Sequence, residues 1–440
     1  MAVAPQARPI RLVVRDNDLR RNRLTVFFRL LLAIPHFVWL VLWGTAASIV
    51  AFILWLAVLI EGQAPEILHD FVAGYVRYAT QLSAYLFLAA DPYPGFRGRP
   101  GYPVDVEIDP PARQSRWSGF FRLLLATPAI LLSSALGAGF TWSASGGFYL
   151  IFVALATSSG VAGAVAFLAW FAIVVLGREP RGLRDLTAYA LGYGAQTGGY
   201  ALLLTGRYPS SDPAFAEEYA ELPEHPVQIA VTDDLGRPRL TVLFRLLLTI
   251  PHFVWLTLWS VAAFFAALAA WFVALVIGRV PSALHRFLAA YVSYATHVFA
   301  YLYLVGRRFP GFTGRAGSYG VDLEIDPPHL QSRWKTLFRL FLAFPALLLA
   351  SALGSVAFVV GFLGWWYAFV TGRMPEGLRN LGASCLRYSA QTYAYLFLLT
   401  DRYPYAAPVL RARPEPTRPT PMPMLLLPRP PAEPIPGDAF

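Results

Sequence analysis

The chain has 440 residues, of which 56% are hydrophobic and only 14% are charged. Soluble globular domains carry about 25% charged residues, so this composition argues against an ordinary soluble protein. The net charge is +10, but the 36 Arg and Lys residues punctuate apolar runs and do not form the solvated basic surface that nucleic-acid binding requires. We therefore expect no nucleic-acid partner.

One phrase, F-R-L-[LF]-L-x-x-P, occurs four times, starting at Phe28, Phe121, Phe244 and Phe338. Each copy leads into a long apolar run, then a G-x-x-P corner, then a Tyr-rich segment. Such a regular period indicates structural repeats. They are predicted at 1–96, 97–212, 213–312 and 313–405. The Pro-rich tail, 406–440, is expected to be disordered.

Each repeat opens with a short alternating segment that is typical of a strand of about five residues. In the first repeat Ile10, Leu12 and Val14 alternate with Arg11, Val13 and Arg15. The equivalent segments of the later repeats are Val104–Ile108, Val227–Val231 and Val321–Ile325. Asp-Pro-Pro follows two of these segments and stops the strand.

The repeated phrase itself predicts an interfacial helix with Phe27, Phe28, Leu31 and Leu32 on one face. Its arginine falls elsewhere on the helix, so we expect this side chain to extend outward to the lipid headgroups. The four interfacial arginines are Arg29, Arg122, Arg245 and Arg339. The proline that ends the phrase begins or kinks the next helix.

Long apolar runs such as 37–60 and 253–277 are long enough to cross a bilayer as helices. The second repeat carries an insertion at 137–160, rich in Gly, Ser and Ala, which is either a loop or a re-entrant piece. After each corner a second, less apolar helix is predicted, at 75–90, 189–204, 291–305 and 385–399.

Two arguments favour a membrane crossing by these second helices. Two spans per repeat place all four strands on one side of the membrane, where they can form one sheet, and lone strands are not stable. Most basic residues also lie on that side, which the positive-inside rule assigns to the cytoplasm. The predicted fold is mainly α: an integral membrane helical bundle of about eight spans, built from four quasi-repeats (2+2), with four short strands and both termini on the cytoplasmic side.

The strongest candidate site is a polar ladder on the second helices, with residues spaced i, i+3 and i+7 on one helix face. Polar side chains in hydrocarbon are costly unless they find partners, so this face should point into the bundle. The ladder consists of Tyr78, Gln81, Tyr85, Tyr193, Gln196, Tyr200, Tyr294, His297, Tyr301, Tyr388, Gln391 and Tyr395. Either it lines a polar cavity that holds a lipid headgroup or solute, or it forms structural hydrogen bonds between helices.

No other pattern indicates chemistry. His36 matches His252, and His69 matches His285, but the two pairs lie at opposite ends of their spans without further ligands, so no metal is expected. No nucleophile, phosphate or zinc motif is present in the sequence, so we expect no catalytic residue and no cofactor. The single Cys385 is expected to be a small packing residue.

The strings VDVEIDPPARQSRW, FRLLLAIPHFVWL and GRMPEGLRNLGASCLRYSAQTYAYLFLLTDRYP resemble a bacterial membrane-protein family known as domain of unknown function 4389. The resemblance covers most of the chain as tandem copies. It implies an integral membrane protein and transfers no catalytic residue.

The sequence thus indicates a multi-pass protein of the inner (plasma) membrane with a scaffold or lipid-interacting role. The alternative is a transporter or channel-like protein whose polar path is lined by the ladder, and a membrane enzyme is the third interpretation. The expected partner is the lipid bilayer, including anionic headgroups attracted by the basic residues of the strand linkers and the four F-R-L arginines. The sequence identifies no protein partner.

Overall fold

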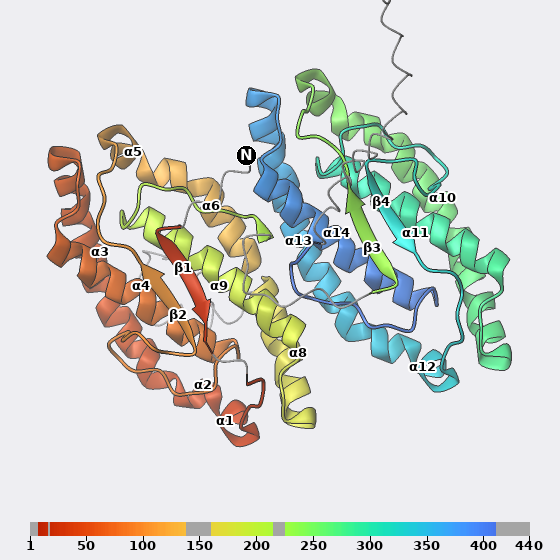
Figure 1. Ribbon diagram of the computed structural model, residues 1–440, viewed down its shortest axis with the longest axis horizontal. Helices are drawn as coiled ribbons and strands as arrows, with labels where there is room; N and C mark the ends of the chain where they lie inside the picture. Colours follow the sequence, from red (N-terminus) through yellow and green to blue (C-terminus); the bar gives the residue numbers. More distant parts are fainter. Residues whose placement is uncertain (1–7, 16–17, 138–159, 214–224, 411–440) are drawn as a thin grey trace, which may run out of the picture.

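A computed structural model describes residues 8–15, 18–137, 160–213 and 225–410 of the chain (Figure 1). The predicted insertion at 137–160 therefore lies outside the described residues except for its two end glycines, and so does most of the predicted tail. The first tail residues, 406–410, are packed and not disordered. Arg387 donates hydrogen bonds to the carbonyls of Ala407 and Val409, which holds this segment against the last helix.

Figure 1 shows two halves side by side, and each half contains two repeats. The first half contains β1 (Ile10–Val14), α1 (Arg23–Phe27), α2 (Arg29–Leu32), α3 (Ile34–Glu61), α4 (Glu66–Leu86), β2 (Val104–Ile108), α5 (Arg116–Phe120), α6 (Arg122–Leu136), α8 (Val161–Leu176) and α9 (Arg181–Ala201). The second half contains β3 (Val227–Val231), α10 (Arg239–Ile277), α11 (Ser282–Leu302), β4 (Val321–Ile325), α12 (Arg333–Leu337), α13 (Arg339–Thr371) and α14 (Glu376–Leu396).

Three kinds of segment recur in every repeat. The FRL segments are residues 21–32, 114–125, 237–248 and 331–342. The long helices are α3, α6 with α8, α10 and α13, and the second helices are α4, α9, α11 and α14. The corners between long and second helices are Gly62, Gly177, Gly278 and Gly372. These glycines have φ between +72° and +80° and close the long helices, because a left-handed residue lets the chain leave a helix without a Cβ clash.

The second helices end differently, at a left-handed leucine. Leu88, Leu203, Leu304 and Leu398 have φ between +60° and +68°. This region is uncommon for residues other than glycine. Each leucine is at most 3% exposed, so burial of its side chain offsets the backbone cost.

The four predicted strands are confirmed, but they do not form one sheet. β1 pairs with β2, and β3 pairs with β4, in two separate antiparallel sheets. The registers are equivalent: Leu12 faces Val106 at the centre of the first sheet, and Ile229 faces Leu323 at the centre of the second. Pairing is thus restricted to the two repeats of one half.

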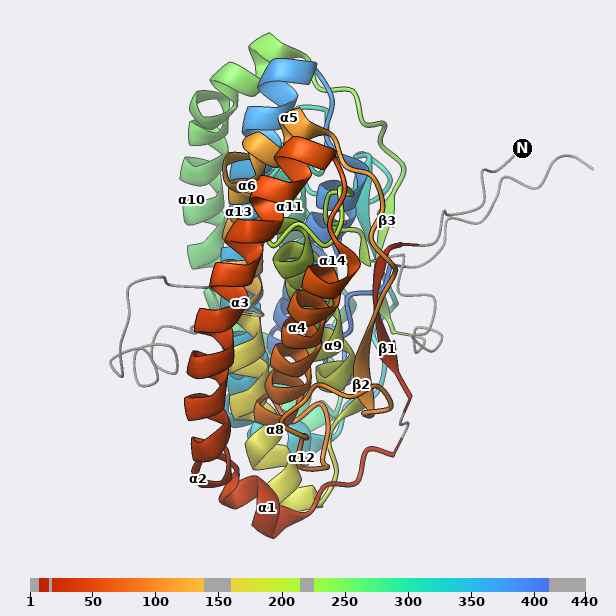
Figure 2. The same cartoon turned by 90° about the vertical axis from the view of Figure 1, so that its left-hand side faces the viewer.

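The molecule is built in three layers, seen edge-on in Figure 2. The long helices form one outer layer, the second helices lie in the middle, and the strands form the other outer layer. Contacts agree with the picture, because β1 packs on α9, β2 on α4, β3 on α14 and β4 on α11. The strands lie along the second helices and not beyond their ends.

The two repeats of each half are joined reciprocally. The backbone N–H at the start of each FRL segment donates to the carbonyl of the partner repeat's corner glycine. The four bonds join Gln114 to Gly62 (2.8 Å), Arg21 to Gly177 (3.2 Å), Gln331 to Gly278 (2.8 Å) and Arg237 to Gly372 (2.8 Å). The same patch of each repeat contacts its equivalent on the other, as in a two-fold symmetric dimer.

The halves meet where α13 packs against α6 and α8. Leu349 and Val356 of α13 share one apolar core with Leu132 of α6 and Val165 of α8. Cys385 of α14 is buried in the same core, as the sequence suggested for a packing residue.

Three helices of the described chain are long and apolar enough to cross a membrane: Ile34–Glu61, Arg239–Ile277 and Arg339–Thr371. The helices α6 and α8 are apolar but shorter. The second helices do not belong to this set, and they carry charged residues such as Arg77 and Arg387 in their central turns. The fold is mainly helical with three candidate membrane helices.

Candidate functional site: the polar ladder

The ladder residues lie on the second helices, as their spacing predicted, and they face the interior. All are at most 4% exposed except Gln196, which is partly buried. Each ladder has three positions, which we call rungs: a tyrosine, then glutamine or histidine three residues later, then a second tyrosine four residues after that. Each rung has a different kind of partner.

The first rung is a tyrosine, which in repeats 1 and 3 is bonded to a histidine of the long helix. The hydroxyl of Tyr78 lies 2.8 Å from Nδ1 of His36, and that of Tyr294 lies 2.7 Å from Nδ1 of His252. The matched histidines are therefore structural partners of the ladder. In repeats 2 and 4 alanine stands in their place, so this particular bond cannot form there.

The second rung binds the strand layer. In repeat 1, Nε2 of Gln81 donates to Asp105 Oδ1 (3.0 Å) and to the Arg99 carbonyl (2.9 Å). In repeat 3, Nε2 of His297 lies 2.9 Å from Asp322 Oδ1. Burial would raise the pKa of Asp322, but the hydrogen bond and charge of His297 outweigh it and hold this pKa below its ordinary value.

Repeats 2 and 4 use the same rung with backbone partners. Gln391 donates to the carbonyl of Val227 in β3 at 3.0 Å and accepts from the Tyr405 N–H at 3.1 Å. Gln196 accepts from the Ser210 N–H at 3.0 Å and from the Arg8 guanidinium at 3.3 Å. The middle rung therefore fastens every second helix to neighbouring chain in the strand layer.

The third rung is a tyrosine whose ring packs against the guanidinium group of the F-R-L arginine. The guanidinium carbons of Arg29, Arg122, Arg245 and Arg339 lie 4.2–4.4 Å from the ring centroids of Tyr85, Tyr200, Tyr301 and Tyr395. At most 2% of each arginine is exposed. The prediction that these four arginines reach lipid headgroups is wrong, because their guanidinium groups are buried inside the protein.

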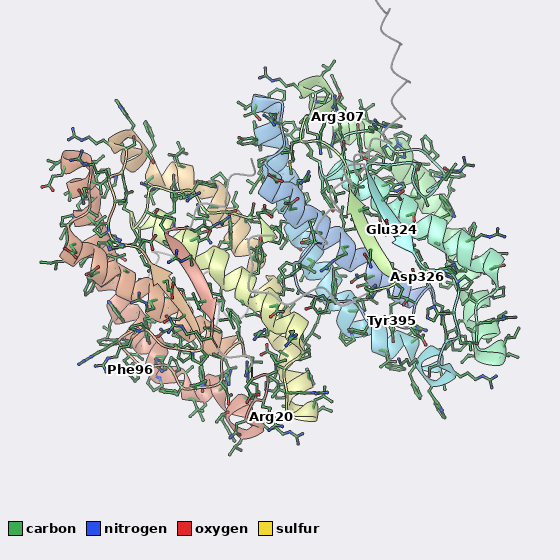
Figure 3. All side chains as sticks on the ribbon, viewed as in Figure 1. Arg20, Phe96, Arg307, Glu324, Asp326 and Tyr395 are labelled. Atoms are coloured by element: carbon green, nitrogen blue, oxygen red, sulfur yellow. The ribbon has the colours of Figure 1, made fainter. Side chains whose placement is uncertain are left out.

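The arginines turn inward because the carbonyls at the ends of the second helices can accept further hydrogen bonds. Arg29 donates to the carbonyls of Tyr85 (2.6 Å) and Ala90 (3.0 Å), and Arg339 donates to those of Tyr395 (3.1 Å) and Thr400 (2.9 Å). The last carbonyls of a helix have no partner within the helix and carry partial negative charge, so a cation there is favourable. Figure 3 labels Tyr395, and the guanidinium carbon of Arg339 lies 4.4 Å from the centroid of this ring.

A second set of arginines was overlooked in the sequence. Six positions before each buried arginine stands an exposed one: Arg23, Arg116, Arg239 and Arg333. Arg23 donates to the Val175 carbonyl at 3.1 Å and Arg333 to the Val276 carbonyl at 3.0 Å, at the corners of partner repeats. The constant spacing of six was the available signal. We name this set the rim arginines.

The first half also contains a buried ion pair that the sequence did not reveal. Arg21 lies 3.1 Å from Glu179, with side-chain exposures of 3% and 0%. Burial raises the pKa of Glu179 to about 8, and the charge of Arg21 opposes this shift. In the second half Arg237 repeats the carbonyl bonds of Arg21, but Met374 stands at the position of Glu179.

Among the described residues, no three His, Cys, Asp or Glu side chains are close enough to hold a metal ion. An open surface depression of about 430 Å³ lies over repeat 4, beside Lys335, Asp401 and Arg402. The third-rung Tyr395 also lines this depression, next to Asp401, whose carboxylate accepts a hydrogen bond from Arg339 at 2.6 Å.

A family model described as Domain of unknown function (DUF4389) matches residues 23–97, 148–211, 239–313 and 333–407, which is well over half of the chain. The chain belongs to this family. No curated protein and no solved structure matches it. The DUF4389 matches confirm four tandem copies. Three of the four begin at a rim arginine, Arg23, Arg239 or Arg333, and all of them leave the strands outside.

Proposed function

We propose that this protein is a membrane scaffold that binds lipid through its layer of long helices. The observation that carries the proposal is the outer face of that layer. Large apolar side chains are exposed along every long helix, among them Phe52, Phe171, Phe265 and Phe362. Exposing such a surface to water would cost free energy. Exposed apolar patches of this kind mark membrane or protein contact sites.

The ladder supports a scaffold role over a transport role. A transport path needs polar groups that remain free to bind a passing solute. Here Gln81, His297 and Gln391 are buried and already bonded to the strand layer. Their geometry favours structural hydrogen bonds, the second of the two interpretations that the sequence left open.

The rim arginines support a preference for anionic lipid. Arg23 and Arg239 are exposed and stand directly beside Leu24 and Leu240, which are 68% and 70% exposed. Basic residues next to an inserted apolar surface are attracted to anionic headgroups. The lipid partner proposed from the sequence is therefore kept, but with the rim arginines in place of the buried ones.

The inner (plasma) membrane with both termini in the cytoplasm is proposed as the location. Two arrangements of the helices in that membrane compete. One is the eight-span bundle, and the other is a protein embedded from one side.

Membrane fractionation tests the proposal. The full-length protein should remain with membranes after washes with sodium carbonate at high pH and with concentrated salt, and detergent alone should release it. Recovery in the soluble fraction without detergent would refute membrane embedding. The double variant Gln81→Leu, Gln391→Leu separates the roles: a scaffold loses thermal stability, whereas a transporter keeps its stability and changes solute flux in proteoliposomes.

A further inference from the structure

We infer that the layer of long helices lies in the plane of one leaflet of the bilayer, with the strand layer in water, and that the described fold does not cross the membrane. This inference rests on the proposed membrane embedding and specifies its geometry. Four observations support it. The exposed apolar face of the long helices is covered by the acyl region of a single leaflet.

The first observation is length. The helix α10 has 39 residues and is therefore about 58 Å long. Its exposed face is apolar from Leu240, which is 70% exposed, to Ile277, which is 57% exposed. The hydrocarbon core is only about 30 Å thick. To keep this whole apolar face in hydrocarbon, a crossing α10 would have to tilt by about 60° from the bilayer normal. Crossing helices usually tilt by at most about 40°.

The second observation is the contact between FRL segments and corners. In an eight-span bundle the FRL segments lie on the strand side and the corners on the opposite side of the membrane. In the structure the two meet, because Gln114 bonds to Gly62 and Gln331 bonds to Gly278, both at 2.8 Å. Residues in direct hydrogen-bond contact cannot face opposite aqueous phases across a hydrocarbon core.

The third observation is the depth of the strand charges. Arg77, in the middle of α4, donates to the Val106 carbonyl of β2 at 3.0 Å. The neighbouring Arg11 and Glu107 form an ion pair whose side chains are 42% and 44% exposed. If α4 crossed the membrane, these charges would lie at the bilayer centre, where each costs several kcal/mol. A helix in the membrane plane leaves them in water.

The fourth observation is symmetry. Each half is a two-fold pair of repeats with a shared sheet, centred on Leu12 and Val106 in the first half and on Ile229 and Leu323 in the second. With the long helices in the membrane plane, both repeats sit at the same depth. The rim arginines then surround the apolar face at headgroup level, next to exposed Trp117 and Trp334. Trp and Arg at that level are typical of an interfacial anchor.

The single lysine of the chain provides a test that barely changes the protein. Lys335 is exposed in an FRL segment, so a membrane-impermeant amine reagent labels it in sealed vesicles of one orientation. Two further probes in a Lys335→Arg background conserve charge: Arg15→Lys beside the strands and Arg279→Lys at a corner, both exposed. Peptide mapping distinguishes each lysine from the terminal amine.

The inferred geometry predicts that all three positions are labelled from the same side of the membrane. Labelling of the corner lysine from the side opposite to Arg15→Lys would overturn it. Since Arg→Lys preserves the charge, a folding failure is not expected, and the unsubstituted chain with Lys335 serves as the folded reference.

Depth measurements give an independent readout. Single cysteines replace the exposed Leu243, Phe265 and Val276 along α10 in a Cys385→Ser background and carry a fluorophore. Lipids brominated at shallow or deep positions should quench all three fluorophores to the same degree. A deep centre flanked by two shallow ends would show a crossing helix and overturn the inference.

Failure of the membrane proposal gives a different result. A protein that comes off membranes without detergent, as a soluble dimer joined by the apolar faces, refutes both proposals. A protein that resists carbonate but exposes its corners on the opposite side refutes only the in-plane geometry.

Discussion

The guanidinium group of Arg245 lies 4.2 Å above the ring of Tyr301 and donates a hydrogen bond of 2.6 Å to the carbonyl of the same residue. One side chain thus binds both the side chain and the backbone at the end of a second helix. The same relationship recurs in repeats 1 and 4, where Arg29 binds Tyr85 and Arg339 binds Tyr395. In repeat 2, Arg122 keeps the contact with the Tyr200 ring but donates to the carbonyl of Thr205.

Arg245→Leu is expected to destabilise the protein by about 3 kcal/mol, because the charge-assisted hydrogen bonds to the buried carbonyls of Tyr301 and Gly306 are lost together with the contact to the Tyr301 ring. Thermal unfolding in detergent micelles, followed by near-UV circular dichroism, measures the loss. The control is Arg239→Leu, six positions earlier and exposed, which should change stability by less than about 1 kcal/mol. Equal losses in the two variants would contradict the capping role of Arg245.

The rim arginines are expected to determine lipid preference and not the stability of the core. Replacing Arg116 and Arg239 together by Gln is expected to lower the preference for phosphatidylglycerol over phosphatidylcholine several-fold, since each basic residue near an anionic surface contributes about 1 kcal/mol. Spin-labelled lipids in reconstituted membranes report this preference. It should also weaken with added salt, because surface charges are screened. An unchanged preference would show that these arginines serve only the corners.

His297→Gln should be tolerated, because Gln81 makes the equivalent bond to Asp105 in repeat 1. His297→Leu should cost about 2 kcal/mol, because Asp322 loses its side-chain partner and keeps only the backbone N–H groups of Gly317 and Leu323. The pKa of Asp322 is held below its ordinary 3.8, so its contribution to stability is present above that pH and is lost as pH falls further. Acid unfolding of the two variants checks this, and equal stability of both would contradict the role of the second rung.

The strands and the ladder face could be predicted because both depend on local pattern. Alternation and the following Asp-Pro-Pro fixed the ends of β2 and β4, and the i, i+3, i+7 spacing placed the ladder on one helix face. The partners of the ladder could not be predicted in this way. Asp105 and Asp322 lie on strands that pack against α4 and α11 through tertiary contacts.

The direction of the four F-R-L arginines was misjudged for a related reason. A helical pattern shows that Arg29 does not belong to the apolar stripe, but outward and inward orientations both satisfy the pattern. The inward orientation of Arg29 is the more stable one, because α4 ends at the left-handed Leu88 and its last carbonyls can bind a cation. Likewise, strand alternation does not specify partners, and the reciprocal contact of two repeats produces two sheets where one was expected.

The ion pair between Arg21 and Glu179 should make stability depend on pH in the neutral range. The ordinary pKa of the carboxyl is 4.5 and burial raises it to about 8 in the folded protein. Between these values the folded state holds more protons than the unfolded state, so the free energy of unfolding falls as pH rises from about 4.5 to about 8. The second half offers the matched variant, Glu179→Met, because Met374 occupies the equivalent buried position beside Arg237. Glu179→Met should fold and should flatten this part of the pH profile, measured as the midpoint of thermal unfolding in detergent at pH 5, 6.5 and 8. Parallel profiles for the variant and the unsubstituted chain would contradict a raised pKa at Glu179.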